Sequence, residues 1–262
     1  MGAFAAGLRV QVDGEVARVT LDRPDRRNAQ TPALWRALAA VPGGLPERVR
    51  AVLVDATGPS FSAGLDRAMF TTEGIPGEPS LLELAAAAQH DPAFVDATIA
   101  SFQDAFSWLR DTRFVSVAAV QGHAVGAGFQ LALACDLRIV SADAQLSIRE
   151  PSLGLVPDLG GTKPLVQCLG YARALELCVT GRWMSAAEAV GTGLAVSCVP
   201  RADLPGAADA LVQALTGAPV EAVRATKRLL QEAAGRSYPD QLAAERAEQA
   251  GRLRDLARAA ST

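Results

Sequence analysis

The chain of 262 residues carries a formal net charge of −3 and is half hydrophobic. This length allows a substantial buried core, and the slight acidity argues against nucleic-acid binding, which usually depends on a basic surface. No hydrophobic run reaches the roughly 18 residues needed to span a membrane, and residues 1–7 lack the features of a secretion signal. We therefore expect a cytoplasmic protein that binds neither nucleic acid nor a membrane.

Cysteine and histidine content limits the chemistry available. None of the cysteines forms a CxxC pair and all lie in hydrophobic patterns, which predicts reduced, buried thiols; they are Cys135, Cys168, Cys178 and Cys198. His90 and His123 are the only histidines. A metal site made of several histidines is therefore excluded, and a Ser-His-Asp triad has few possible forms.

The first 56 residues predict strands and one helix. Alternating residues on both sides of Asp13-Gly14, over 8–12 and 15–21, indicate a hairpin. Thr31 and Pro32 are typical of a helix N-terminus, and we expect this helix to end at Ala40, before Pro42. Residues 51–54 are all hydrophobic, and we expect a strand over 51–56 that is covered on both faces.

The middle of the chain repeats one arrangement. Residues 71–80 hold two glycines and two prolines and predict a mobile loop, of a kind that often borders ligand sites. We expect a helix over 92–110, a strand over 114–120, a helix over 128–135, and strands over 137–140 and 145–148. Strand, small-residue loop and helix thus occur twice, which predicts parallel strands joined by right-handed crossovers.

The remainder is predicted to be mainly helical from Thr162. Ser185 and Glu188 match a capping box, residues 194–199 resemble a strand, and helices are expected near 202, 219 and 238. Together these patterns predict an α/β protein. We divide it into a repeat core over residues 1–200 and a C-terminal helical region over residues 201–262.

Two glycine-containing loops, residues 61–66 and 122–128, form the candidate site. Each follows a buried strand, and small residues let a ligand approach the backbone. The helix after the second loop begins with free N–H groups at the positive end of its dipole. If the loops converge, they form an oxyanion hole. Neither the GxGxxG nor the GxxxxGK[ST] motif is present, so dinucleotide and P-loop sites lack support.

Four polar residues near these loops could do chemistry, and each has a structural alternative. Glu150 is either a base or half of a surface ion pair with Arg149. Asp66 and Asp158 stand where helix N-caps belong. Gln130 follows the second loop on the same helix face as its N–H groups, or is an amide of a packed helix.

A basic cluster at Arg23, Arg26 and Arg27 is the remaining candidate. These arginines form either a turn exposed to solvent or a contact for an anionic ligand such as a phosphate.

Several motifs in order resemble the crotonase superfamily, the enoyl-CoA hydratase/isomerase family. The similarity covers roughly residues 8–235, and its motifs are residues 19–24 with 28–29, 61–66, 121–130 with 135–136, 150–162, and 175–195. It implies a spiral of ββα repeats with a helical C-terminal part that forms trimers, often paired into hexamers.

The resemblance also implies an acyl-CoA thioester substrate, with its oxygen between the backbone N–H groups of Ala63 and Ala127. It implies no metal or cofactor, because coenzyme A is part of the substrate. The expected contacts to the CoA ester are Arg23, Arg27, Ser62, Gly64, Leu65, Asp66 and Gly126.

One departure from the family pattern directs the functional hypothesis. Family hydratases use two glutamates, but one of these positions is Gln130, whose amide cannot exchange protons. Glu150 alone suits a double-bond isomerase, and Asp158 matches a second carboxylate of the dienoyl-CoA isomerases. We therefore expect an enoyl-CoA isomerase with Glu150 as acid and base, Asp158 holding or relaying the proton, and Gln130 orienting the acyl group.

Two alternatives remain. One is an enoyl-CoA hydratase in which Asp158 helps to position water. The other is a non-catalytic protein that binds acyl-CoA.

Overall fold

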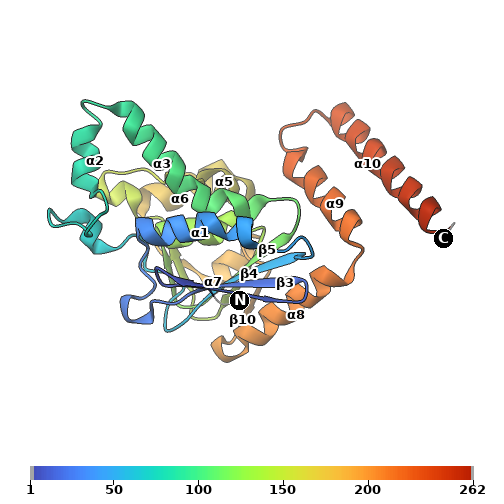
Figure 1. The fold of residues 1–262 in the computed structure, drawn as a ribbon, viewed down its shortest axis with the longest axis horizontal. Helices are drawn as coiled ribbons and strands as arrows, with labels where there is room; N and C mark the ends of the chain where they lie inside the picture. The colour runs from blue at the N-terminus through green and yellow to red at the C-terminus, as the bar shows by residue number, and fades with distance from the viewer. Residues whose placement is uncertain (1–2, 261–262) are drawn as a thin grey trace.

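The computed structural model describes residues 3–260, which form an α/β fold around a sheet of seven strands (Figure 1). The strands follow one another in space as they do along the chain: β1 (Ala3–Ala5), β2 (Leu8–Asp13), β3 (Val16–Leu21), β4 (Ala51–Ala56), β5 (Val115–Val120), β7 (Leu137–Ser141) and β10 (Ser197–Val199). β1, β2 and β3 pair antiparallel, and all later neighbours pair parallel. The α/β class is confirmed.

A second sheet lies beside the site. It contains β6 (His123–Val125), β8 (Gln145–Ser147) and β9 (Met184–Ser185), with β6 parallel to β8 and β8 antiparallel to β9. β6 was not predicted. It is only three residues long and sits inside the second glycine loop, where its pairing depends on a distant strand.

Helices cover both faces of the large sheet. They are α1 (Pro32–Gly44), α2 (Leu81–Ala87), α3 (Pro92–Ser107), α4 (Ala127–Ala134), α5 (Thr162–Leu169), α6 (Tyr171–Thr180), α7 (Ala186–Gly191), α8 (Leu204–Gly217), α9 (Val220–Ala233) and α10 (Tyr238–Ala259). Single 3₁₀ turns are η1 (Pro24–Arg26), η2 (Arg67–Phe70), η3 (Trp108–Arg110), η4 (Glu150–Leu153) and η5 (Arg201–Asp203).

Residues at the ends of these elements explain where several of them begin. Thr31 caps α1 by accepting the Leu34 N–H, and Ser185 caps α7 by accepting the Glu188 N–H. The predicted end of α1 was wrong, because the helix continues through Pro42 to Gly44. Pro42 lies in the last turn of the helix, and the buried Val41 holds that turn against the core.

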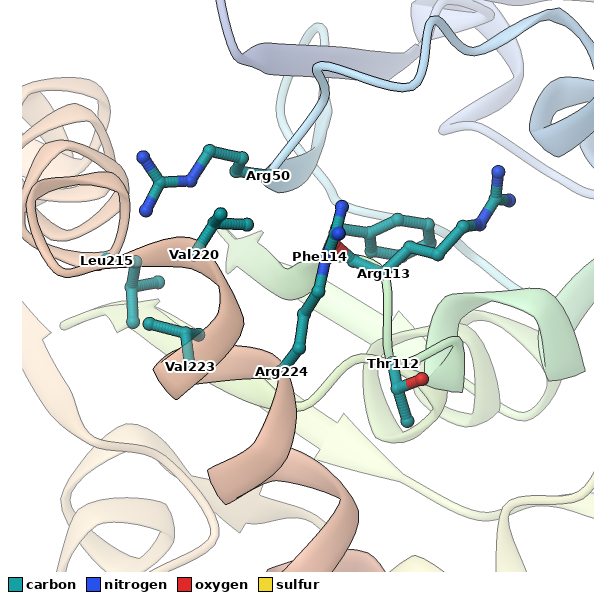
Figure 2. Close-up of a pocket in the computed structure, with 8 residues that line it drawn as sticks. All are labelled: Arg50, Thr112, Arg113, Phe114, Leu215, Val220, Val223 and Arg224. Atoms are coloured by element: carbon teal, nitrogen blue, oxygen red, sulfur yellow. The ribbon is translucent and has the colours of Figure 1, made fainter. Parts of the chain in front are cut away.

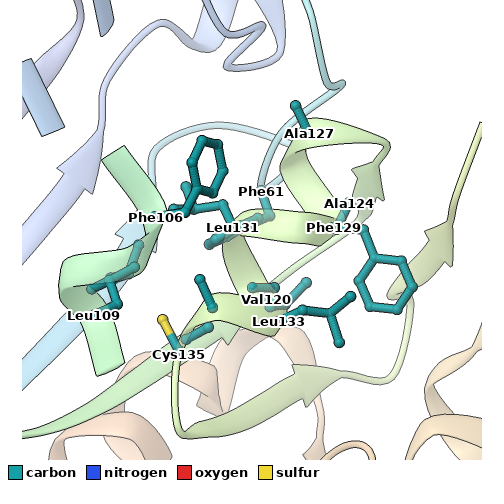
Figure 3. Close-up of a cluster of buried hydrophobic side chains, with 14 of the residues drawn as sticks. Phe61, Phe106, Leu109, Val120, Ala124, Ala127, Phe129, Leu131, Leu133 and Cys135 are labelled. Atoms are coloured by element: carbon teal, nitrogen blue, oxygen red, sulfur yellow. The ribbon is translucent and has the colours of Figure 1, made fainter. Parts of the chain in front are cut away.

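The main hydrophobic core lies between the sheet and the helices α1, α3 and α4. Figure 3 shows its centre, where Phe61 and Phe106 pack with the buried side chains of α4. Every residue of α4 is buried. Because this helix is enclosed on all sides, its N-terminus is held rigidly at the second glycine loop.

The opposite face of the sheet is covered by α8, whose Leu204, Ala208 and Val212 pack on β4, β5 and β7. In Figure 1, α9 and α10 form an arm that extends away from the sheet, with the C-terminus at its far end. Lys227 anchors this arm. It is 8% exposed and lies 2.6 Å from the Asp136 carboxylate. The division at residue 200 stays a prediction, although α8 packs directly on the core.

Two smaller expectations need correction. α2 was not predicted, although Ser80 and Glu83 form a complete capping box at its start. All four cysteines are free, as expected, but they are not all buried: Cys198 is exposed because β10 is an edge strand of the sheet. No helix within residues 3–260 is both long and hydrophobic enough to cross a membrane.

Candidate active site

The two glycine-containing loops converge. Ser62 pairs with Ala124 in a short parallel bridge, in which the Ser62 N–H donates to the His123 carbonyl and the Val125 N–H to the Ser62 carbonyl. Gly64 has a φ of +85°, and a Cβ there would lie 2.6 Å from the Val125 oxygen. Only glycine allows this approach, so the loops meet because of their residue types.

The free backbone donors differ in part from those predicted. Ala127 is the first residue of α4, and within residues 3–260 its N–H donates to no acceptor. The Ala63 N–H is occupied, however, because it donates to the Arg27 carbonyl at 2.9 Å. The Leu65 N–H is the one in this loop left without an acceptor among the described residues. The Ala63 expectation is therefore replaced by Leu65.

A large cavity opens in front of both donors. Its volume is about 1160 Å³, and residues of both loops, of η1, η2 and η4, and of α1, α2 and α3 line it. Leu65, Gly126 and Ala127 lie on its wall together with Glu150 and Asp158. The cavity therefore brings the predicted carboxylates and the backbone donors to one place.

Glu150 is held in a defined orientation beside the second loop. Its Oε1 accepts the Gln130 Nε2–H at 2.7 Å, and its Oε2 accepts the Arg149 N–H at 2.8 Å. A Cβ at Gly126 would lie 3.1 Å from Oε1, so glycine makes room for the carboxylate. Burial raises the pKa of Glu150 and the Asp158 carboxylate raises it further, while the hydrogen bonds act in the opposite direction.

Gln130 is fully buried and all its amide atoms are engaged. Its oxygen accepts the N–H groups of Leu159 at 2.9 Å and Gly161 at 3.3 Å, so its nitrogen must face Glu150. These bonds orient the carboxylate and the loop 158–161. The expected role of Gln130 in orienting an acyl group stays a prediction, since its observed partners are protein groups.

Asp158 lies on the cavity wall, and burial raises the pKa of its carboxyl group. The alternative of a helix cap is wrong for this residue. α5 begins at Thr162 with Gly161 as its N-cap, and no side chain caps it. Asp158 is thus a second carboxyl group at the cavity with raised pKa.

Comparisons with known proteins show the family of this chain. Residues 11–253 match the model of the family described as enoyl-CoA hydratase/isomerase. The chain belongs to this family. The enoyl-CoA hydratase/isomerase family is also called the crotonase family, so the resemblance seen in the sequence is confirmed.

Structures of a protein named "a putative enoyl-CoA hydratase from Thermobifida fusca YX" are similar to this member of the family. One is 50% identical with a TM-score of 0.91, covering 97% of this chain and 95% of that one. Another, in complex with acetoacetyl-CoA, is 50% identical with a TM-score of 0.90, covering 95% and 96%. A Mycobacterium tuberculosis H37Rv protein named "Probable enoyl-CoA hydratase EchA14" is 36% identical, covering 93% of this chain and 88% of its own length.

Two of the predicted contact residues, Arg23 and Ser62, need revision in this family member, and a third, Asp66, also has a structural role. The Arg23 guanidinium donates to the Ala29 carbonyl at 2.6 Å and pairs with Asp66, and Arg23 is not on the cavity wall. The Ser62 side chain is fully buried, and Ser62 is not on the cavity wall. Asp66 lines the cavity but also caps η2 by accepting the Ala68 N–H, as its alternative reading predicted.

Other predicted contacts are on the cavity wall, namely Arg27, Gly64, Leu65 and Gly126. Two further arginines line the cavity but were not among the expected contacts to the CoA ester. Arg26 had been seen only as part of the basic cluster, and Arg67 directly follows the first loop, which was the available signal. Three arginines therefore lie on the wall near the first loop.

A second, much smaller cavity offers no comparable chemistry. It measures about 10 Å³, room for about one water molecule, and lies between the start of α9 and β5 (Figure 2). Arg50, Arg113, Phe114 and Arg224 line it without a carboxylate, cysteine or histidine. Within residues 3–260 there is also no group of three or more His, Cys, Asp or Glu side chains suited to a metal ion.

Proposed function

We propose that this family member is an enoyl-CoA isomerase, which moves a double bond in the acyl chain of a CoA thioester. One observation carries the proposal. Where a family hydratase has a second glutamate, the Gln130 amide instead donates to Glu150 at 2.7 Å, and its oxygen is already bonded to two backbone N–H groups. Glu150 is thus the ionisable partner of this pair, which suits a reaction that moves one proton.

The thioester oxygen binds between the N–H groups of Leu65 and Ala127. Removing a proton next to the thioester, or at the far end of the double bond, places negative charge on that oxygen as an enolate forms. Fixed donors stabilise this charge, and losing one typically lowers the rate about 10²- to 10³-fold. Ala127 adds the positive end of the α4 dipole.

Glu150 removes the proton and returns it to the other carbon. Its raised pKa makes the carboxylate a stronger base and lets the acid form persist long enough to return the proton. Asp158 lies on the same wall, near enough to influence Glu150 electrostatically, and holds or relays the proton. No metal or cofactor enters this scheme.

The cavity wall is consistent with a CoA ester along its length. Arg26, Arg27 and Arg67 supply positive charge for the phosphates of CoA. The wall formed by α1, α2 and α3 is hydrophobic, with Trp35, Leu84 and Phe102 among its residues, and it receives the acyl chain.

The decisive test is Glu150→Gln, assayed with a 3-enoyl-CoA. We expect turnover to disappear while binding of the CoA ester, measured by calorimetry, remains within about threefold, because the amide retains the shape of the side chain but cannot take a proton. Turnover close to that of the wild type would refute the proposal.

Hydration of a 2-enoyl-CoA is the second candidate. Asp158, a second cavity carboxyl group with raised pKa, favours it because it could help Glu150 to position water. Crotonyl-CoA separates the two reactions. Rapid loss of its conjugated thioester absorbance supports hydration, whereas no loss together with isomerisation of a 3-enoyl-CoA supports the first proposal.

We also propose that the protein assembles as a trimer or a hexamer. The arm of α9 and α10 leaves large hydrophobic side chains exposed: Leu230 is 70%, Leu253 56% and Leu256 66% exposed. Large exposed hydrophobic patches commonly mark protein contacts. Light scattering of the purified protein gives the mass directly, and a monomer would contradict this proposal.

A further inference from the structure

We infer that Gln30 positions Leu65, whose N–H is the proposed oxyanion donor, and that Trp35 fixes the orientation of the Gln30 amide. Trp35 lines the cavity in which the acyl chain is proposed to bind. Gln30 does not line the cavity and is fully buried. It therefore acts through Leu65 and is a positioning residue. The inference rests on the proposed function, in which the Leu65 N–H binds the thioester oxygen.

The backbone of Gln30 holds both neighbours of Leu65. The Gln30 N–H donates to the Gly64 carbonyl at 2.7 Å, and the Asp66 N–H donates to the Gln30 carbonyl at 2.8 Å. These two bonds form a parallel bridge centred on Leu65. The Leu65 peptide is thus clamped on either side while its own N–H takes no part in the bridge.

The side chain of Gln30 also holds this loop in place, through Ser62. Its Nε2 donates to Ser62 Oγ at 3.2 Å, and that hydroxyl donates to the Asn28 carbonyl at 2.8 Å. Ser62 Oγ also accepts the Gly64 N–H at 3.2 Å. A hydroxyl has one donor and two acceptor positions, so all three are used. The Gly64 N–H, just before Leu65, is thereby directed away from the cavity.

Trp35 decides which way the Gln30 amide points. The indole Nε1–H can only donate, and it donates to Gln30 Oε1 at 2.7 Å. The amide nitrogen must therefore face Ser62. Trp35 is 4% exposed, and its ring packs against Phe102 with centroids 4.7 Å apart. Trp35 and Phe102 both line the part of the cavity proposed to receive the acyl chain. Through Gln30, Trp35 is therefore linked by hydrogen bonds to the first loop, whose Leu65 N–H is proposed to bind the thioester oxygen.

The arrangement matters for rate because an oxyanion donor must be in place before charge develops. Without the amide bridge, the Ser62 hydroxyl can turn away from the Gly64 N–H, and the Leu65 N–H is held less precisely, by the two backbone bonds of residue 30 alone. The ground-state thioester depends less on this bond than the enolate does. Loss of positioning should therefore lower kcat and leave KM nearly unchanged.

The test uses the whole chain of 262 residues and three substitutions. Gln30→Met keeps the volume but removes the amide, and Trp35→Phe keeps a ring but removes the N–H. Trp108→Phe is the matched control, because the Trp108 indole donates to the Ala105 carbonyl at 3.0 Å and is not on the cavity wall. We expect kcat to fall about tenfold in the first two, below the ~10²- to 10³-fold loss for a deleted donor, with KM within about twofold. Trp108→Phe should retain wild-type kcat.

A second readout needs no turnover. The infrared stretch of bound hexanoyl-CoA, labelled with ¹³C at the thioester carbonyl, reports hydrogen bonding to that oxygen. We expect a lowered frequency in the wild type and in Trp108→Phe, and a partial return towards the free value in Gln30→Met and Trp35→Phe. If Gln30→Met does not fold, Ser62→Ala removes one oxygen from the same relay and should behave likewise.

The outcomes separate this inference from the proposed function. An unchanged kcat and carbonyl frequency in both Gln30→Met and Trp35→Phe would overturn the inference alone. A fall in kcat without a frequency change would also overturn it, since it would indicate general damage. If the wild type itself shows no lowered frequency, the oxyanion site and hence the proposed function fail.

Discussion

Gln130 Nε2 and Glu150 Oε1 lie 2.7 Å apart, so an uncharged amide is the immediate neighbour of the proposed base. A carboxylate in place of that amide could still accept the N–H groups of Leu159 and Gly161. It would, however, place a second acid next to Glu150. The identity of this one residue therefore affects both the pKa of the base and the number of groups that can carry a proton.

We expect Gln130→Glu to increase the hydration of crotonyl-CoA by at least about tenfold, since a positioned acid or base typically contributes about 10²- to 10⁴-fold. Loss of the conjugated thioester absorbance measures this rate. Gln213→Glu, which adds the same charge at an exposed position of α8, should have no effect. An unaltered hydration rate in folded Gln130→Glu would show that the residue at this position does not choose between the reactions.

The second prediction concerns pH. A base must be ionised, so kcat/KM should rise with pH as Glu150 loses its proton, at a pH above the usual range for glutamate because burial raises its pKa. The Asp158 carboxylate raises this pKa further, so Asp158→Asn should lower it and move the acid limb to lower pH. A pH profile of kcat/KM measures the shift. Asp96→Asn, an exposed control, should leave the acid limb in place. An acid limb that moves to higher pH in Asp158→Asn would contradict the assignment of this limb to Glu150.

The third prediction concerns the contact between the two loops. A Cβ on Gly64 would lie 2.6 Å from the Val125 oxygen, whereas one on Gly193 meets no atom within 4 Å. The φ angles are similar, +85° and +78°, so both alanine variants carry a backbone strain of about 1–3 kcal/mol. Gly64→Ala alone also pushes the loops apart.

We therefore expect Gly64→Ala to lower the free energy of unfolding more than Gly193→Ala does, and to lower kcat about 10²-fold, as for a lost oxyanion donor. Urea unfolding and steady-state kinetics measure the two effects. Equal losses of stability and activity in both variants would show that the contact between Gly64 and Val125 is unimportant.

The fourth prediction concerns the anchor of the C-terminal arm. Lys227 Nζ donates to the carbonyls of Asp111 at 2.6 Å and Phe114 at 2.8 Å, besides its ion pair with Asp136. Lys227→Met leaves the largely buried Asp136 carboxylate without its cation, and breaking a buried pair typically costs about 3–5 kcal/mol. We expect a loss of that order in the free energy of unfolding.

Arg228→Met is the comparison for this variant. Arg228 is the next residue of α9 and forms a more exposed pair with Glu248 at 2.9 Å. Exposed ion pairs contribute about 0–1 kcal/mol, so denaturant unfolding should show a small change. Equal losses in the two variants would mean that burial of the Lys227 pair does not matter.

The local features of this protein could be read from its sequence. The hairpin at Asp13-Gly14, the Thr31 cap and the glycines of both loops were predicted because turns, caps and close backbone approaches depend on residues a few positions apart. α2 was readable in the same way from Ser80 and Glu83 but was missed. Similarity to a known family added the acyl-CoA substrate class, which spacing alone would not have supplied.

The tertiary structure decided which of these groups are free to act. Ala63 and Leu65 belong to the same loop, yet the Ala63 N–H is taken by Arg27, which is distant in the sequence, and the Leu65 N–H is left open. Likewise Gln130 could be placed on its helix from sequence, but its bonds to Glu150 and Gly161 come from other segments of the chain. Residue type and local geometry determine what a group can do, and long-range packing determines which partner it meets, because a hydrogen bond between distant segments forms only after they fold together.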